Sequence, residues 1–249
     1  MEEELLFYDA YEEFYTMAKE SEIFKEFCKE AYGEDFSQDG FSDINQINKI
    51  LPYVNEGAEI LDIGCGNGKM LMYLKEKCKA SIHGFDYSNK AIEYAKMADK
   101  EADFEVGIIG EKEYPDESFD VVIAMDSVYF AKDMKALVKQ VRRWLKKDGV
   151  FFVAYQEGDV MDKTEDENST VFAKALKEIG WDYEVRDISL ESFEMLDKKR
   201  KIALKYSEQF HKEGIGMWGD LLIDQTDYIL QGKDKYLKNL ARYIYVCKK

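Results

Sequence analysis

A strand-like run that ends in three alternating glycines constrains the fold of this chain more than any other feature. The run Glu59-Ile-Leu-Asp62-Ile is followed by Gly64, Gly66 and Gly68, and an apolar helical pattern begins directly after them. Glycines at this spacing allow a tight turn and let backbone groups approach a ligand without a Cβ in the way. In open α/β sheets, ligands bind at the carboxyl ends of the strands, where the strand order reverses. We therefore expect a ligand site on this turn.

The rest of the chain alternates short apolar runs with helical patterns, which is typical of βαβ units and a mainly parallel sheet. We predict strands at 58–63, 80–85, 103–107, 119–125 and 149–155, with two more near 182–188 and 240–247. Helices are predicted at 68–77, 88–100 and 133–146, and residues 145–149 are predicted to form a turn. The predicted fold is α/β, a three-layer, doubly wound, mainly parallel seven-stranded sheet.

Helical segments flank this pattern at the start of the chain and interrupt it near the end. Residues 4–31, from Leu5 onward, carry apolar side chains at helical spacing, and a short helix is expected over 43–51. We predict that 1–52 forms N-terminal helices that cap a substrate site. Residues 53–249 would form the ligand-binding domain, with a helical insertion at about 190–232 before the last strand. These helices either close one end of the sheet as a lid or thicken the core.

Composition excludes several classes of partner. The chain has 35 Lys and Arg against 51 Asp and Glu, a formal charge of −16, which would repel a phosphate backbone, so no nucleic-acid partner is expected. The four cysteines show no CxxC spacing and no accompanying histidine cluster, so neither a metal site nor a disulfide framework is predicted. No run approaches the roughly 18 apolar residues of a membrane span. We expect a cytoplasmic protein without a membrane partner.

The residues around the glycines narrow the choice of ligand. A dinucleotide loop needs a third glycine at position 69, which is Lys69, and the charge of Asp62 would disfavour a pyrophosphate. The segment instead resembles the first motif of the class I methyltransferases that use S-adenosylmethionine (SAM), (D/E)-x-G-x-G-x-G. The resemblance implies that Asp62 and the loop surround the methionine part of SAM, whose ammonium and sulfonium need acceptors and negative potential. The loop residues are Gly64, Cys65, Gly66, Asn67 and Gly68.

Two further segments resemble family motifs at the ribose and adenine ends. Asp86 ends the second predicted strand, and the resemblance implies that its carboxylate accepts hydrogen bonds from the two ribose hydroxyls, with Tyr87 packing on the ligand. At the adenine end, Gly110 stands where the family carries Asp. Either Glu111 or the backbone of Ile109 and Gly110 is then expected to contact the adenine amino group.

The sequence leaves the catalytic residues open. The predicted strand 119–125 delivers Asp126, Ser127 and Tyr129 to the ligand end of the sheet, where Asp126 and Ser127 are expected to face the methyl group or the acceptor. His211 lies at the end of the inserted helix, before a break at Gly214, where a lid would place it over the substrate. Asp126, Tyr129 and His211 are therefore the candidates, and methyl transfer by positioning alone would need no base.

The resemblance predicts an enzyme that transfers the SAM methyl group to an N or O atom of a small-molecule acceptor. The excess of negative charge favours a cationic or neutral acceptor. The chain carries no Asn-Pro-Pro-Tyr motif and no Pro-Cys nucleophile of the nucleic-acid methylating relatives. Two alternatives remain: a methyltransferase that acts on protein or tRNA, and a non-catalytic SAM-binding regulatory protein.

Overall fold

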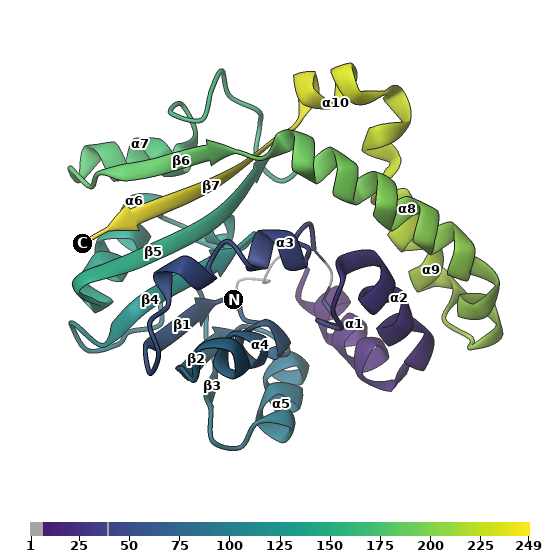
Figure 1. Ribbon diagram of the computed structural model, residues 1–249, viewed down its shortest axis with the longest axis horizontal. Coiled ribbons are helices and arrows are strands. Elements are labelled where there is room, and N and C mark those ends of the chain that lie inside the picture. Colours follow the sequence, from purple (N-terminus) through teal and green to yellow (C-terminus); the bar gives the residue numbers. More distant parts are fainter. Residues whose placement is uncertain (1–6, 39) are drawn as a thin grey trace, which may run out of the picture.

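The computed structural model describes residues 7–38 and 40–249. The predicted helical start at Leu5 lies outside them. The described chain carries a seven-stranded sheet in the order β3-β2-β1-β4-β5-β7-β6 with helices on both faces (Figure 1). All neighbouring strands are parallel except β7, which runs antiparallel to both β5 and β6. The predicted doubly wound, mainly parallel sheet is confirmed.

The strands follow the predicted ranges closely. They are β1 (Glu59–Ile63), β2 (Ser81–Asp86), β3 (Asp103–Val106), β4 (Phe119–Met125), β5 (Leu145–Glu157), β6 (Tyr183–Asp187) and β7 (Ala241–Lys248). The turn predicted at 145–149 is wrong, because β5 already begins at Leu145. Leu145 pairs with Phe119 and Val150 pairs with Val121, so the strand carries extra residues here, and Asp148 takes the left-handed conformation. The irregularity is a bulge inside the sheet.

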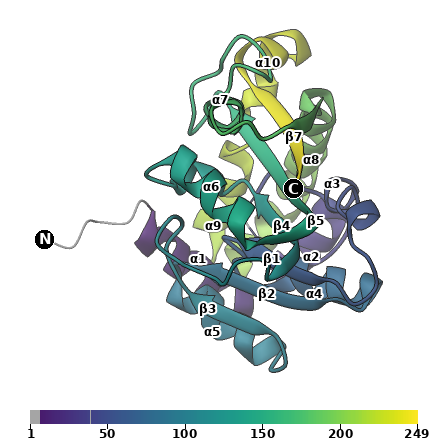
Figure 2. The same ribbon diagram turned by 90° about the vertical axis from the view of Figure 1, so that its left-hand side faces the viewer.

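Two apolar cores lie on the two faces of the sheet. Side chains alternate along each strand, so Ile60 joins one core while Leu61 and Ile63 join the other. The first core lies under α4 (Lys69–Cys78) and α5 (Asn89–Ala98), and the second under α6 (Met134–Trp144) and α7 (Val171–Glu178). Figure 2 shows α6 and α7 on the opposite side of the strands from α3 (Ile44–Ile47) and α4. Helix α7 was not predicted.

The first helices pack against the segment between β6 and β7. Helix α1 (Tyr8–Glu20) contacts α5, and α2 (Glu22–Tyr32) packs on the 24-residue α8 (Ser189–Lys212). Beyond α8 follow α9 (Gly216–Asp224), the 3-10 helix η3 (Asp227–Gln231) and α10 (Lys233–Asn239). These helices extend to one side of the sheet (Figure 1). The predicted helical segment before the last strand is present. A further 3-10 turn, η1 (Leu51–Tyr53), joins α3 to β1, and η2 (Val128–Phe130) follows β4.

None of the helices in the described ranges is both long enough and apolar enough to cross a membrane.

Candidate active site

The glycine turn after β1 takes a conformation that other residues adopt at a cost. Gly64, Gly66 and Gly68 have φ values of 77°, 53° and 74°, all in the left-handed region. A Cβ on Gly64 would lie 2.8 Å from the Cβ of Ser127, and one on Gly68 would lie 2.6 Å from the ring of Phe104. Conformation and space therefore both require glycine, and the turn leads directly into α4.

Helix α1 covers this turn. A Cβ on Gly66 would lie 2.3 Å from Oη of Tyr15, so the tyrosine hydroxyl occupies the space above the glycine backbone. Glu12 fixes the helix in this place, because its Oε1 accepts hydrogen bonds from Oγ of Ser88 at 2.7 Å and from the backbone N–H of Lys90 at 3.0 Å. The N-terminal residues thus form part of the site.

Two buried carboxylates lie at the ends of β1 and β2. Asp62 is 2% exposed, and its Oδ1 has no hydrogen-bond partner among the described residues. Burial, and then the charge of Asp86, raise the pKa of Asp62 to about 8. Asp86 accepts hydrogen bonds from the backbone N–H of Gly66 at 3.0 Å and of Ser88 at 2.9 Å. Burial raises the pKa of Asp86 to about 6, although these backbone hydrogen bonds oppose the shift. A buried oxygen without a donor is costly, and a bound cation or donor would satisfy it.

Asp126 forms a buried ion pair that the sequence did not reveal. Arg242 on β7 is fully buried, and its two terminal nitrogens donate to the two carboxylate oxygens of Asp126 at 2.7 and 2.6 Å. Its Nε donates to Oε1 of Gln46 at 3.0 Å, and Oη of Tyr129 donates to Oδ1 of Asp126 at 3.0 Å. The backbone of Asp126 has φ 59°, an uncommon conformation for a residue with a side chain. The arginine therefore holds Asp126 at a strained position at the end of β4.

A cavity of about 1000 Å³ joins these features. Eleven of the predicted residues line it: Asp62, Gly64, Cys65, Gly66, Asn67, Asp86, Tyr87, Ile109, Asp126, Ser127 and Tyr129. Side chains from α1, α9 and η3 complete the wall, among them Phe14, Trp218 and Tyr228. The rings of Phe14 and Trp218 meet edge to face with their centroids 5.7 Å apart. The chain's first helix and its inserted helices thus meet across the site.

Four predicted residues do not line the cavity. Gly68 begins α4 behind the loop. Gly110 and Glu111 lie outside, and Glu111 instead lies 3.6 Å from Nζ of Lys132. His211 is exposed and faces Asp220 at 3.5 Å, near the end of α8 that is remote from the sheet. The structure therefore gives no support to His211 as a catalytic group or to Glu111 as an adenine contact, whereas the backbone of Ile109 is at the cavity.

Of the functional residues that sequence reasoning missed, Arg242 left the clearest signal. It is the one charged residue in the run Ala241–Cys247, which is otherwise apolar or aromatic. A charged side chain in a central strand needs a buried partner of opposite charge. Tyr15 and Tyr228 left no comparable signal, because their aromatic character is equally consistent with a core position.

The fold and the site together define a class. Residues 61–153 match the family model described as a methyltransferase domain. This match contains the glycine turn, Asp86 and Asp126. The chain contains a methyltransferase domain of the class I, SAM-dependent type, as the resemblance implied.

Particular relatives extend the similarity beyond this domain. Phosphoethanolamine N-methyltransferase of Plasmodium falciparum is 24% identical over 214 residues, which cover 83% of this chain and 75% of the relative. Phosphoethanolamine N-methyltransferase 3 of Arabidopsis thaliana is 31% identical over 122 residues, 47% of this chain but 25% of the relative. The chain thus spans about a quarter of the plant protein.

Among solved structures, Haemonchus contortus phosphoethanolamine N-methyltransferase 2 in complex with SAM has the same fold. It superposes with a TM-score of 0.75 at 20% identity, and the match covers 96% of this chain and 60% of that one. The sheet with its flanking helices and the helices between β6 and β7 are therefore both part of the shared fold.

Proposed function

We propose that this chain is a methyltransferase that transfers the methyl group of SAM to an N or O atom of a small-molecule acceptor. The observation that carries the proposal is the unpartnered, buried Oδ1 of Asp62 beside a glycine turn that opens into a large cavity. An aminoacyl ammonium is the kind of group that would satisfy this oxygen.

The residues present fit SAM along its length. Asp62 and the backbone of Gly64–Gly66 would hold the methionine part. Asp86 would accept from the ribose hydroxyls through lone pairs that its backbone donors leave. The ring of Tyr87 and the backbone of Ile109 would face the adenosine part. Bound SAM supplies an electrophilic methyl group on a positively charged sulfur.

The chain's own contribution to transfer is alignment and exclusion of water. The acceptor's lone pair would form the new bond to the methyl carbon while the carbon–sulfur electron pair returns to sulfur. Burial first, and then the charge of Asp126, raise the pKa of Tyr129, so this phenol stays protonated and acts as a donor. Asp126, fixed by Arg242, would orient the acceptor from the end of β4.

We propose further that the N-terminal helices within 1–52 and the inserted helices within 190–232 form the acceptor pocket. Residues of α1, α9 and η3 reach the cavity from both segments, which supports this division. The formal charge of −16 disfavours tRNA as the acceptor. A cytoplasmic location is also proposed, in keeping with four cysteines that are all unpaired.

Incubation with methyl-labelled SAM and a deproteinised metabolite extract tests the proposal. We expect label in a small product, which is then identified by mass spectrometry. Label that appears only after protein or RNA is added would overturn the small-molecule assignment. Tight SAM binding in calorimetry with no turnover in any mixture would instead indicate a non-catalytic SAM-binding protein.

A further inference from the structure

The topology separates the cavity into two halves. The strand order places β2 and β3 on one side of the β1–β4 centre and β5 on the other. Asp86 and Tyr87 follow β2, whereas Gln156 and Asp159 lie at or just beyond the end of β5. The residues proposed to hold SAM lie in the β1–β2–β3 half of the cavity. The β4–β5 half, which α9 and η3 border, is therefore left for the acceptor.

We infer, resting on the proposed function, that the acceptor is an amine with an apolar or aromatic body that enters the cavity as a cation. The ammonium form has no lone pair, so it releases one proton to solvent before the nitrogen attacks the methyl carbon and the carbon–sulfur electron pair returns to sulfur. Phosphorylated amines are not accepted. The inference goes beyond the N or O acceptor proposed above. It depends on the aromatic and charged side chains that meet in the acceptor half.

Aromatic rings from separate elements surround the acceptor half. Phe14 comes from α1, Phe41 from the loop before α3, Trp218 from α9 and Tyr228 from η3. Such rings bury the apolar body of a ligand, and their faces attract an organic cation. They supply no positive charge to a phosphate group.

Carboxylates supply the charge of this half. Asp126 lies at its base with a side chain that is 15% exposed, and its three hydrogen bonds leave it room for one more donor. Asp159 and Asp224 lie at the exposed rim, and Oη of Tyr228 donates to Oδ1 of Asp159 at 3.0 Å. A cation entering the cavity would pass these rim carboxylates first.

Arg242 neutralises Asp126, whereas no basic side chain among the described residues forms an ion pair with the rim carboxylates Asp159 and Asp224. Within the parts of the chain that the structure describes, Lys132 is the only basic residue on the cavity wall, and it lies 3.6 Å from Glu111. Lys199 and Arg242 are fully buried and do not line the cavity, since Lys199 donates to Oε1 of Gln225 and Arg242 is paired with Asp126. Phosphate recognition depends on Arg or Lys forks aimed at the ligand. The acceptor half would therefore repel a phosphate dianion.

Fractionated acceptors and one defined compound test the inference. A deproteinised extract is separated by ion exchange into cationic, neutral and anionic pools, and each pool, as well as pure phosphoethanolamine, is incubated with the protein and methyl-labelled SAM. We expect a labelled product from the cationic pool and none above the blank from phosphoethanolamine. Label from the anionic pool or phosphoethanolamine would overturn the inference while leaving the proposed function intact. Absence of label from every pool would overturn both.

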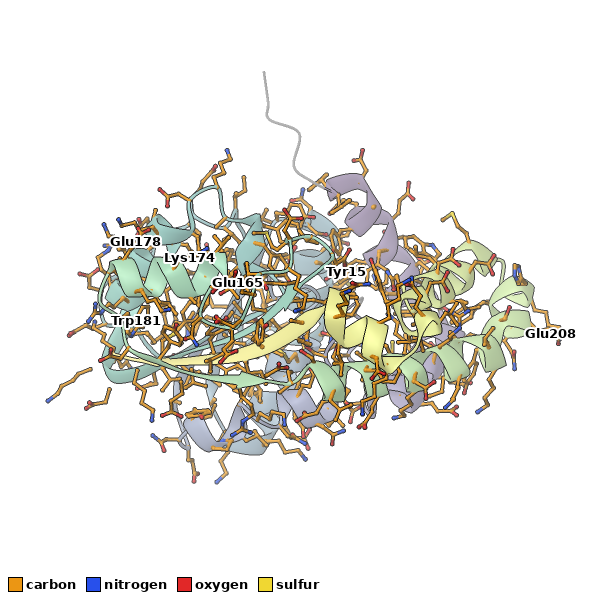
Figure 3. All side chains as sticks on the ribbon, turned by 90° about the horizontal axis from the view of Figure 1, so that it is seen from above. Tyr15, Glu165, Lys174, Glu178, Trp181 and Glu208 are labelled. Carbon is orange, nitrogen blue, oxygen red and sulfur yellow. The ribbon has the colours of Figure 1, made fainter. Side chains whose placement is uncertain are left out.

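Charge reversal at the rim tests the same site directly. We expect Asp159→Lys together with Asp224→Lys to raise KM for the cationic pool at least tenfold, with SAM affinity in calorimetry within twofold of the original protein. Glu208→Lys is the matched control, because Glu208 is 84% exposed near the distal end of α8 (Figure 3). An unchanged KM in the double variant, or an equal change in the control, would refute recognition by these carboxylates.

Discussion

Replacing Asp62 by Asn removes a buried carboxyl group whose ionisation the folded protein disfavours. Its pKa is about 8 in the folded protein, against about 3.9 in an unfolded chain. A raised pKa in an acid means that the folded state binds the proton more tightly than the unfolded state. The protonated carboxyl of Asp62 therefore makes its full contribution to the free energy of unfolding below pH 4, and this contribution is lost as the pH rises toward 8.

The size of the effect follows from this difference. Between pH 5 and pH 7 the unfolded form of Asp62 has lost its proton while the folded form retains it. The free energy of unfolding then falls by about 1.4 kcal/mol per pH unit, or about 3 kcal/mol over this interval. Asp86, whose pKa is raised to about 6, adds a similar dependence at lower pH but is present in both proteins. Asp62→Asn should thus gain stability relative to the original chain by about 3 kcal/mol from pH 5 to pH 7.

Urea unfolding of the ligand-free protein at pH 5, 6 and 7 measures the gain. Asp162→Asn makes the same chemical change at an exposed site outside the cavity and should follow the original protein at every pH. Parallel curves for Asp62→Asn and the original chain would refute the argument that burial holds this carboxyl protonated. Calorimetry adds a second readout, because SAM binding at pH 7 should release close to one proton from the original protein and none from Asp62→Asn.

Three further substitutions test the site. Asp86→Ala should weaken SAM binding at least tenfold in calorimetry, and unchanged affinity would contradict its role at the ribose. Gly66→Ala places a Cβ 2.3 Å from Oη of Tyr15 at a left-handed φ, so we expect SAM affinity to fall at least tenfold with a lower Tm; a variant that binds normally would show that α1 does not press on the turn. Arg242→Met leaves Asp126 buried without its cation and should cost about 3–5 kcal/mol in urea unfolding, whereas a loss under 1 kcal/mol would show that the pair is dispensable.

The sequence predicted the parts of the fold that depend on local pattern. The glycine turn, the strand that ends in Asp86 and the helical segment before β7 each follow from spacing within some 20 residues. The predicted boundaries of an element were wrong where pairing with a distant strand determines them. Leu145, for example, belongs to β5 because it pairs with Phe119.

The parts of the site that depend on distant contacts could not be predicted. Arg242 and Asp126 are 116 residues apart, and no local pattern links them. The sequence predicts His211 over the substrate because the histidine precedes a glycine break. His211 instead lies far from the cavity, because α8 extends for 24 residues, about 36 Å, from the edge of the sheet and the histidine is in its last turn. Helix length in three dimensions, rather than the sequence around the histidine, decided that outcome.

The order in which the site's parts leave the ribosome has its own consequence. Helix α1 is synthesised before the glycine turn, and Arg242 on β7 is synthesised after both. A nascent chain would therefore display the cofactor turn while Asp126 still lacked its cation and Phe14 still lacked Trp218. Synthesis would have to reach β7 before the pocket could close, so this site forms later in translation than a site built from consecutive segments would.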